Sequence, residues 1–120
     1  MYGATVGKTA ILKIKATTNQ AICGLTTKDN SLDNIYLLYF LSSIKSKLID
    51  MSFGGGQPNI SQQLIKSTNI PLPPLHLQQT FASIVEHVEQ LKETQKKSLQ
   101  DIEQLFNVLM QKAFNGELIR

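Results

Sequence analysis

The sequence predicts an α+β protein, in which a small mixed α/β body precedes one long C-terminal helix that pairs as a coiled coil. Three observations predict it: short β-branched runs in the first 25 residues, an amphipathic helical pattern in the middle, and apolar heptads toward the C-terminus. A length of 120 residues suits one small domain plus one long helix. We expect residues 1–74 to form the body and residues 75–120 the helix with a short tail.

Two short apolar runs predict strands near the N-terminus. Thr9–Ile14 contains several β-branched residues in a nearly alternating pattern, and Ala21–Leu25 is a second apolar run. Between them, residues 17–20 are polar and favour a turn, because Thr and Asn side chains hydrogen-bond nearby backbone groups. The amides of Asn19 and Gln20 are equally suited to face a ligand.

The middle of the sequence predicts one amphipathic helix over Ile35–Asp50. Capping side chains precede it in residues 31–33, and Leu37, Leu41, Ile44 and Leu48 recur at helical spacing. Glycines and a proline over residues 54–58 predict a loop after it.

Two further local signals follow that loop. Ser61 is suited to cap a short helix over Gln62–Lys66, with Ile60 and Ile65 placed for a hydrophobic staple. Three prolines in residues 71–74 predict an extended segment, since proline lacks the amide donor and disfavours helix before it.

A heptad pattern from Phe81 onward predicts the long helix. At about 1.5 Å per residue the helix reaches roughly 50 Å, so a body this small cannot cover its apolar stripe. The stripe has a polar centre at Gln95 and Ser98, and Asn115-Gly116 is a suitable helix stop. We expect pairing with another long helix, through Phe81, Ile84, Val88, Leu91, Ile102, Leu105 and Leu109.

The positive charge is concentrated before the long helix. Residues 1–77 hold seven lysines and three aspartates, whereas residues 78–120 hold five basic and six acidic residues. This excess is compatible with a polyanionic partner, although lysines that only keep a protein soluble are commoner. The single cysteine, Cys23, excludes a disulfide within the chain, and no stretch resembles a secretory signal or a membrane span. We expect a soluble cytoplasmic protein.

No motif predicts catalysis, a metal site or a cofactor. Gly3–Thr9 resembles a phosphate-binding loop, but it has three residues between its glycines where four are needed, and a strand pattern follows it. The segment Pro71–Pro74 resembles the amino-methyltransferase motif, but Leu72 replaces the polar residue of that motif and Leu75 replaces its aromatic residue. His76 and His87 have no neighbours at metal-ligand spacing.

Five segments together resemble the specificity subunits of type I restriction-modification enzymes. Each is weak alone, but they occur in the family's order, with the heptad helix between the last two. The segments are Met1–Lys8, Thr17–Ala21, Gly54–Ser61, Ile70–Pro74 and Phe114–Leu118.

The resemblance implies a non-catalytic fragment: the C-terminal part of a DNA target-recognition domain with the helix that follows it. In this family two recognition domains each read half of a split DNA sequence, and long antiparallel helices set their spacing. The implied partners are double-stranded DNA, a methyltransferase subunit that binds S-adenosylmethionine, an ATP-using restriction subunit, and a second copy or another specificity half. The implied location is the prokaryotic cytoplasm.

The resemblance also yields candidate DNA contacts. Lysines are suited to phosphates and amides to base edges, although ordinary turn and surface roles remain open. In the family the first residues of this sequence fall inside a recognition domain, which implies a truncation, natural or artificial. The alternative is a structural fragment that pairs through its helix and does not bind DNA. The candidates are Lys8, Lys13, Lys15, Asn19, Gln20 and Gln57.

Overall fold

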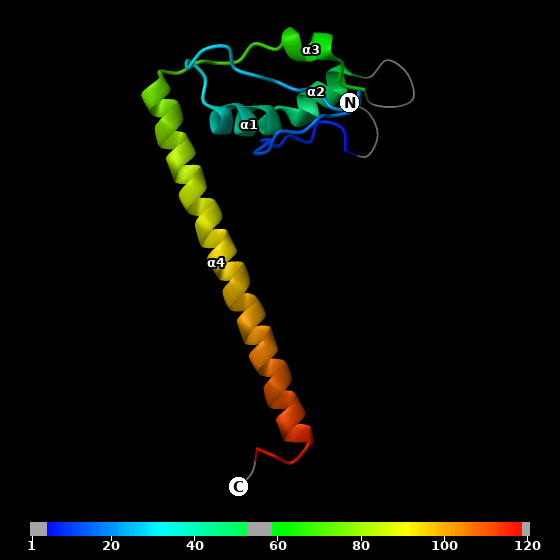
Figure 1. Ribbon diagram of the computed structural model, residues 1–120, viewed down its shortest axis with the longest axis vertical. Helices are drawn as coiled ribbons and strands as arrows, with labels where there is room; N and C mark the ends of the chain where they lie inside the picture. The colour runs from blue at the N-terminus through cyan, green and yellow to red at the C-terminus, as the bar shows by residue number, and fades with distance from the viewer. Residues whose placement is uncertain (1–4, 53–58, 119–120) are drawn as a thin grey trace. The chain divides into compact units, whose positions relative to one another are not determined.

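Among the residues that the structure describes, four helices make up the regular structure (Figure 1). The computed structural model describes residues 5–52 and 59–118. The helices are α1 (Asn34–Ser43), α2 (Lys45–Met51), α3 (Gln62–Lys66) and α4 (Leu75–Phe114). The chain divides into two compact units, Met1–Ala82 and Ser83–Arg120, which we call the body and the distal helix. The first two turns of α4 therefore belong to the body.

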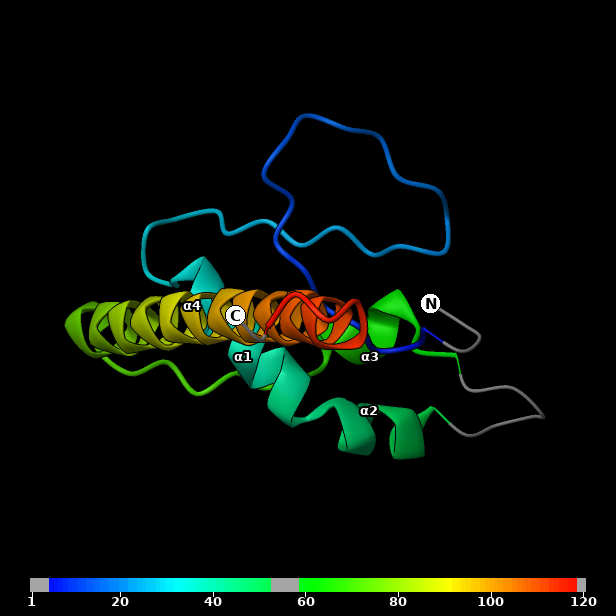
Figure 2. The same cartoon turned by 90° about the horizontal axis from the view of Figure 1, so that it is seen from below.

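The predicted α+β class is wrong for the residues that the structure describes. Thr9–Ile14 and Ala21–Leu25 form no strand, and the only β-type residue in the described ranges is a bridge at Asn59. Figure 2 shows residues 8–30 as a looping chain without a helix. A β-branched run becomes a strand only when another strand lies beside it, and the described residues provide none. Leu12 and Ile14 consequently remain 60% and 72% exposed.

The predicted helix over Ile35–Asp50 is two helices, α1 and α2, which meet at Ile44. Asp33 caps α1 as expected, because its carboxylate accepts hydrogen bonds from the amides of Ile35 and Tyr36 at 2.8 and 3.0 Å. At the other end, the hydroxyls of Ser42 and Ser43 donate to backbone carbonyls of α1. Such bonds compete with the helical ladder, which accounts for the break after two adjacent serines.

A small apolar core joins α2 to the segment around α3. Val6, Leu48 and Ile60 are buried together, and partly buried isoleucine and leucine side chains of α2 and α3 pack against them. The hydroxyl of Ser61 accepts from the Leu64 amide at 3.2 Å, so that the predicted cap and the predicted bounds of α3 are both confirmed. Ile60 is 1% exposed and Ile65 packs on its cluster, as expected for a hydrophobic staple.

Gln78, in the first turns of α4, is the only fully buried polar side chain among the described residues. Its carbonyl oxygen accepts from the Asp33 amide at 2.9 Å. Its amide nitrogen donates to the carbonyls of Ser31 at 3.0 Å and Pro73 at 2.8 Å. One side chain thus ties the start of α4 to the start of α1 and to the proline segment, with every bond made to backbone.

Aromatic contacts reinforce the same region of the body. Phe81 meets Tyr36 and Tyr39 of α1 edge to face, with ring centroids 6.1 and 5.7 Å apart. The Tyr36 hydroxyl donates to the Pro71 carbonyl at 2.9 Å. Residues 68–74, before α4, form no helix, strand or turn, and Pro74 offers its carbonyl to the amides of Leu77 and Gln78.

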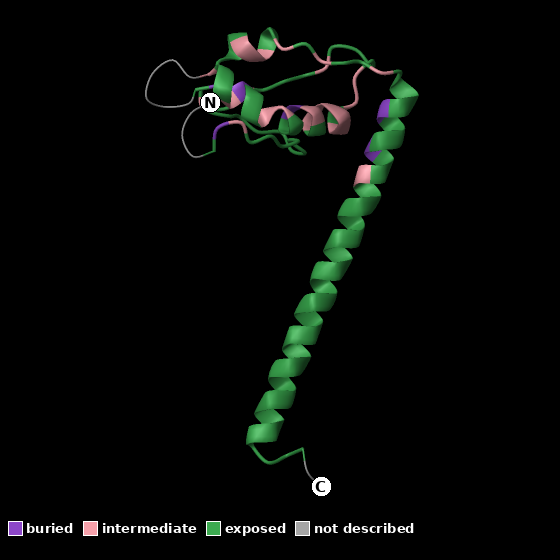
Figure 3. Cartoon of the chain, turned by 180° about the vertical axis from the view of Figure 1, so that it is seen from behind, coloured by how far each residue is buried: buried purple, intermediate pink, exposed green. Residues whose placement is uncertain are grey.

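The distal helix has no buried residue in its described part, Ser83–Leu118 (Figure 3). Its C-terminal end is closed by Gly116, whose φ of 72° lets the Glu117 amide reach the Lys112 carbonyl and the Gly116 amide reach the Ala113 carbonyl. This pattern is a Schellman motif, and it confirms the predicted helix stop. No helix in the described ranges is long and apolar enough to cross a membrane.

Candidate nucleic-acid interface

The three lysines predicted to contact phosphates lie in the looping segment of the body. Lys8, Lys13 and Lys15 are exposed, and no carboxylate of the described residues forms an ion pair with them. The Lys8 amide donates to the Thr5 carbonyl at 3.1 Å, which closes a turn around Gly7. Their charges are therefore available to a polyanion.

The two predicted amides, Asn19 and Gln20, differ in their surroundings. Asn19 folds a turn: its side-chain oxygen accepts from the Ala21 amide at 3.0 Å and its backbone carbonyl accepts from the Ile22 amide at 3.1 Å. Gln20 occupies the middle of that turn and lines a hollow in the surface. Gln57, the third predicted amide, lies outside the described residues.

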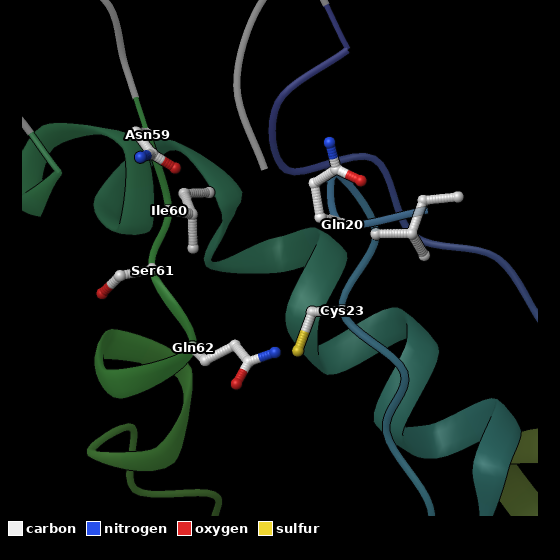
Figure 4. Close-up of a pocket in the computed structure, with 7 residues that line it drawn as sticks. Gln20, Cys23, Asn59, Ile60, Ser61 and Gln62 are labelled. Carbon is white, nitrogen blue, oxygen red and sulfur yellow. The ribbon is translucent and has the colours of Figure 1, made fainter. Parts of the chain in front are cut away.

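The hollow has a volume of about 290 Å³ and brings two distant segments together (Figure 4). The turn supplies one side and the segment that enters α3 supplies the other. Figure 4 shows the carboxamide of Gln62 directed toward the thiol of Cys23, and that of Gln20 pointing away from both. The lining residues are Gln20, Ile22, Cys23, Asn59, Ile60, Ser61 and Gln62.

Lys45 is a fourth basic residue beside the predicted set, and sequence reasoning missed it. A Cβ atom at Gly7 would lie 2.9 Å from Lys45 Cγ and 3.4 Å from Ile60 Cδ1, so the aliphatic stem of Lys45 crosses the turn that precedes Lys8. No local signal predicts this approach, because Gly7 and Lys45 are far apart in the chain and meet only through the core.

The acidic residues of the body are mostly engaged locally. Asp33 caps α1, and Asp29 accepts hydrogen bonds from the hydroxyl and the amide of Ser31. The hydrogen bond from the Ser31 hydroxyl, followed by that from its amide, lowers the pKa of Asp29. In the described ranges, no group of three His, Cys, Asp or Glu side chains could hold a metal ion.

The residues predicted to pair helices fall into two groups. Phe81 is in the body, where it contacts the tyrosines of α1. The other six form an exposed series along the distal helix, each 41% to 64% exposed: Ile84, Val88, Leu91, Ile102, Leu105 and Leu109. An apolar series of this length has no covering partner within the described residues.

The sequence model of one protein family, described as "Type I restriction modification DNA specificity domain", matches residues 1–104. This match spans the body and more than half of the distal helix. No solved structure matches the chain.

Three relatives from the archaeon Methanocaldococcus jannaschii are similar over most of the chain. The specificity subunit of the type I restriction enzyme MjaVIII is 28% identical over 93% of this chain and 26% of its own length. The specificity subunit of the type I restriction enzyme MjaIX is 29% identical over 85% of this chain and 24% of its own length. A relative provisionally named the specificity subunit of the type I restriction enzyme MjaX is 28% identical over 96% of this chain and 27% of its own length. The chain thus spans about a quarter of each relative's length.

Proposed function

Because this chain belongs to the family of type I restriction modification DNA specificity domains, we propose that it is a non-catalytic DNA-recognition module of a type I restriction-modification system. The observation that carries the proposal is the family match across residues 1–104, which takes in the candidate interface and the start of the distal helix. The relatives' names as specificity subunits support it.

The electrostatics of the body support duplex DNA as the ligand. Lys8, Lys13 and Lys15 are exposed and not in ion pairs with described carboxylates, and Lys45 lies beside the first of them. Lysines that neutralise phosphates release counterions, which makes the affinity fall steeply as salt rises. The body offers cations for phosphates and, in its hollow, amides for base edges.

Fluorescence anisotropy with a labelled duplex tests the electrostatic part. We expect salt-sensitive binding that the combined change Lys8→Glu, Lys13→Glu and Lys15→Glu abolishes. A variant with Lys96, Lys97 and Lys112 of the distal helix changed to Glu is the matched control, since it alters the net charge equally. Equal loss in both variants would show a general charge effect, and no loss in the first would overturn the assignment of the three lysines.

The exposed apolar series favours a second candidate function, a structural fragment that pairs through its helix without binding DNA. Sedimentation velocity distinguishes the two, because this candidate predicts a dimer that Leu91→Asp or Ile102→Asp dissociates and the lysine changes leave intact. Gln90→Asp, outside the apolar series, is the control. Absence of duplex binding together with such a dimer would favour this candidate.

Assembly with methyltransferase and restriction subunits belongs to the proposal as well. The chain would contribute recognition to such a complex, and its partners would contribute methylation and cleavage. Helix pairing, with a second copy or with another specificity half, would then set the distance between two recognition units on DNA.

A further inference from the structure

The hollow of the body combines polar and apolar groups that the lysine contacts do not explain. Gln20, Asn59, Ser61 and Gln62 are exposed at its rim, so it is a depression in the surface. Its volume of about 290 Å³ is at the lower limit of small-molecule pockets, which run from about 300 Å³ and enclose most of their ligand. A depression of this size is better suited to bind the projecting edge of a larger ligand than to enclose a small molecule.

Two amides of the hollow have their hydrogen-bonding groups available. Among the described residues, no protein group forms a hydrogen bond with the side chain of Gln20 or Gln62, and neither is held in an ion pair or ring contact. Ser61, by contrast, uses its hydroxyl to cap α3. A carboxamide presents a donor and an acceptor side by side, which matches N7 and the N6 amino group of adenine.

The apolar part of the hollow suits the other base of the same pair. Ile22 is 55% exposed although it is a large apolar residue, and Cys23 lies next to it. In the major groove, thymine differs from cytosine by its exposed C5 methyl group, which apolar side chains contact. An amide beside an apolar surface therefore has the chemistry that distinguishes A·T from G·C.

Building on the proposed function, we infer that this hollow reads one A·T base pair in the major groove, with Gln62 as the principal adenine contact and Ile22 against the thymine methyl. Gln20 and Asn59 flank the same base step. Specificity at this position comes from the hollow, whereas general affinity comes from the lysines.

Selection from a randomised duplex pool by the full chain tests the inference. We expect the unaltered chain to enrich duplexes with A·T at a fixed position. Gln62→Leu should lower the enrichment of A·T at that position about tenfold or more, while the enrichment at the other positions remains. Leucine and glutamine have similar helix propensities, so α3 persists. Gln63→Leu, whose side chain does not line the hollow, is the matched control.

The outcomes separate this inference from the proposed function. Enrichment that Gln62→Leu leaves unchanged overturns the inference and keeps DNA recognition. Binding without any enrichment also overturns it, since no base is then read. Absence of duplex binding by the unaltered chain overturns both.

Base analogues and the single cysteine give two independent measurements on the selected duplex. Replacing adenine by 7-deazaadenine weakens binding by the unaltered chain but does not change binding by Gln62→Leu. Replacing thymine by deoxyuridine weakens binding by the unaltered chain but does not change binding by Ile22→Ala. The duplex also slows alkylation of Cys23 by N-ethylmaleimide, because Cys23 lines the hollow. An alkylation rate that is unchanged by saturating duplex overturns the inference.

Discussion

The body and the distal helix of this chain are stabilised in opposite ways. The body is only partly helical, and contacts between segments far apart in sequence hold it together, such as those of Gln78 and of the Val6 cluster. The distal helix is regular as far as Phe114, and its backbone hydrogen bonds are those of one continuous helix and its C-terminal motif. Its described ion pair, Lys92 to Glu89 at 2.7 Å, is also local and exposed.

The source of stability therefore differs between the two regions. A long-range contact stabilises the body only when all of its segments are in place, so unfolding of the body is expected to be cooperative. The stability of a helix with no covered apolar face depends on the helix propensity of its residues and on its length alone. Such a helix gains tertiary stability only from a partner. The same substitution should therefore have different effects in the two regions.

The largest expected effect is that of Gln78→Leu in the body. Removal of the amide leaves three backbone groups near Ser31, Asp33 and Pro73 without their partner, and we expect a loss of about 3 kcal/mol in the free energy of unfolding. Urea unfolding followed by tyrosine fluorescence measures it, since every tyrosine precedes Ala82. Gln79→Leu, an exposed neighbour, should change little. Equal losses in both variants would contradict the role of Gln78.

Leucine-to-alanine truncation should have unequal effects in the two regions. Leu48→Ala removes a side chain that is 7% exposed from the core, and we expect a loss of about 2.5 kcal/mol. Leu105→Ala, at 59% exposure, should stay within about 0.5 kcal/mol in a monomeric sample. Denaturant titrations at low protein concentration check both, and similar losses would mean that the distal helix is covered.

Two glycines with nearly equal φ give a smaller effect. Gly7 and Gly116 have φ of 71° and 72°, but a Cβ atom at Gly7 would crowd Lys45, whereas at Gly116 it would meet nothing within 4 Å. We expect Gly7→Ala to destabilise the body by about 1.5 kcal/mol. Gly116→Ala should fray only the helix end, at a cost of about 1 kcal/mol. Amide hydrogen exchange locates each change, and Gly24→Ala, which has open space and no positive φ, is the control.

The smallest effect concerns the titration of Asp29. Hydrogen bonds from Ser31 lower the pKa of Asp29, so their stabilisation exists above the pKa of the unfolded chain and is lost as pH falls through the lower pKa of the folded state. Ser31→Ala should raise the pKa of Asp29, because it removes the largest cause of the shift. Carboxyl titration by NMR measures this, with Ser67→Ala as the control. An unchanged pKa would contradict the assignment.

Local signals in the sequence predicted most of the helix ends. The caps at Asp33 and Ser61 and the stop at Gly116 depend on residues within one turn, so a short window contains the whole interaction. The sheet was predicted wrongly, because pairing depends on a second strand that β propensity cannot supply. The break at Ile44 arises from serine hydroxyls that the apolar periodicity does not register.

The candidate site was predictable in part for the same reason. Exposed lysines and a polar turn follow from the local sequence, whereas the hollow exists only because the fold brings Gln62 and Gln20 to the same surface. Lys45 likewise reaches Gly7 through tertiary packing. The assignments of the phosphate, base and helix contacts remain predictions, for which the experiments above provide the tests.

The joint around Gln78 has an evolutionary consequence. The hydrogen bonds of the Gln78 and Tyr36 side chains are made to main-chain atoms of Ser31, Asp33, Pro71 and Pro73, and those atoms persist through substitutions other than proline at position 33. The neighbouring loops are thus free to diverge in composition while the joint persists, provided that its glutamine and its phenol are retained. Homologues with different loop sequences would then keep the same start of α4 and still differ in the surface of the body.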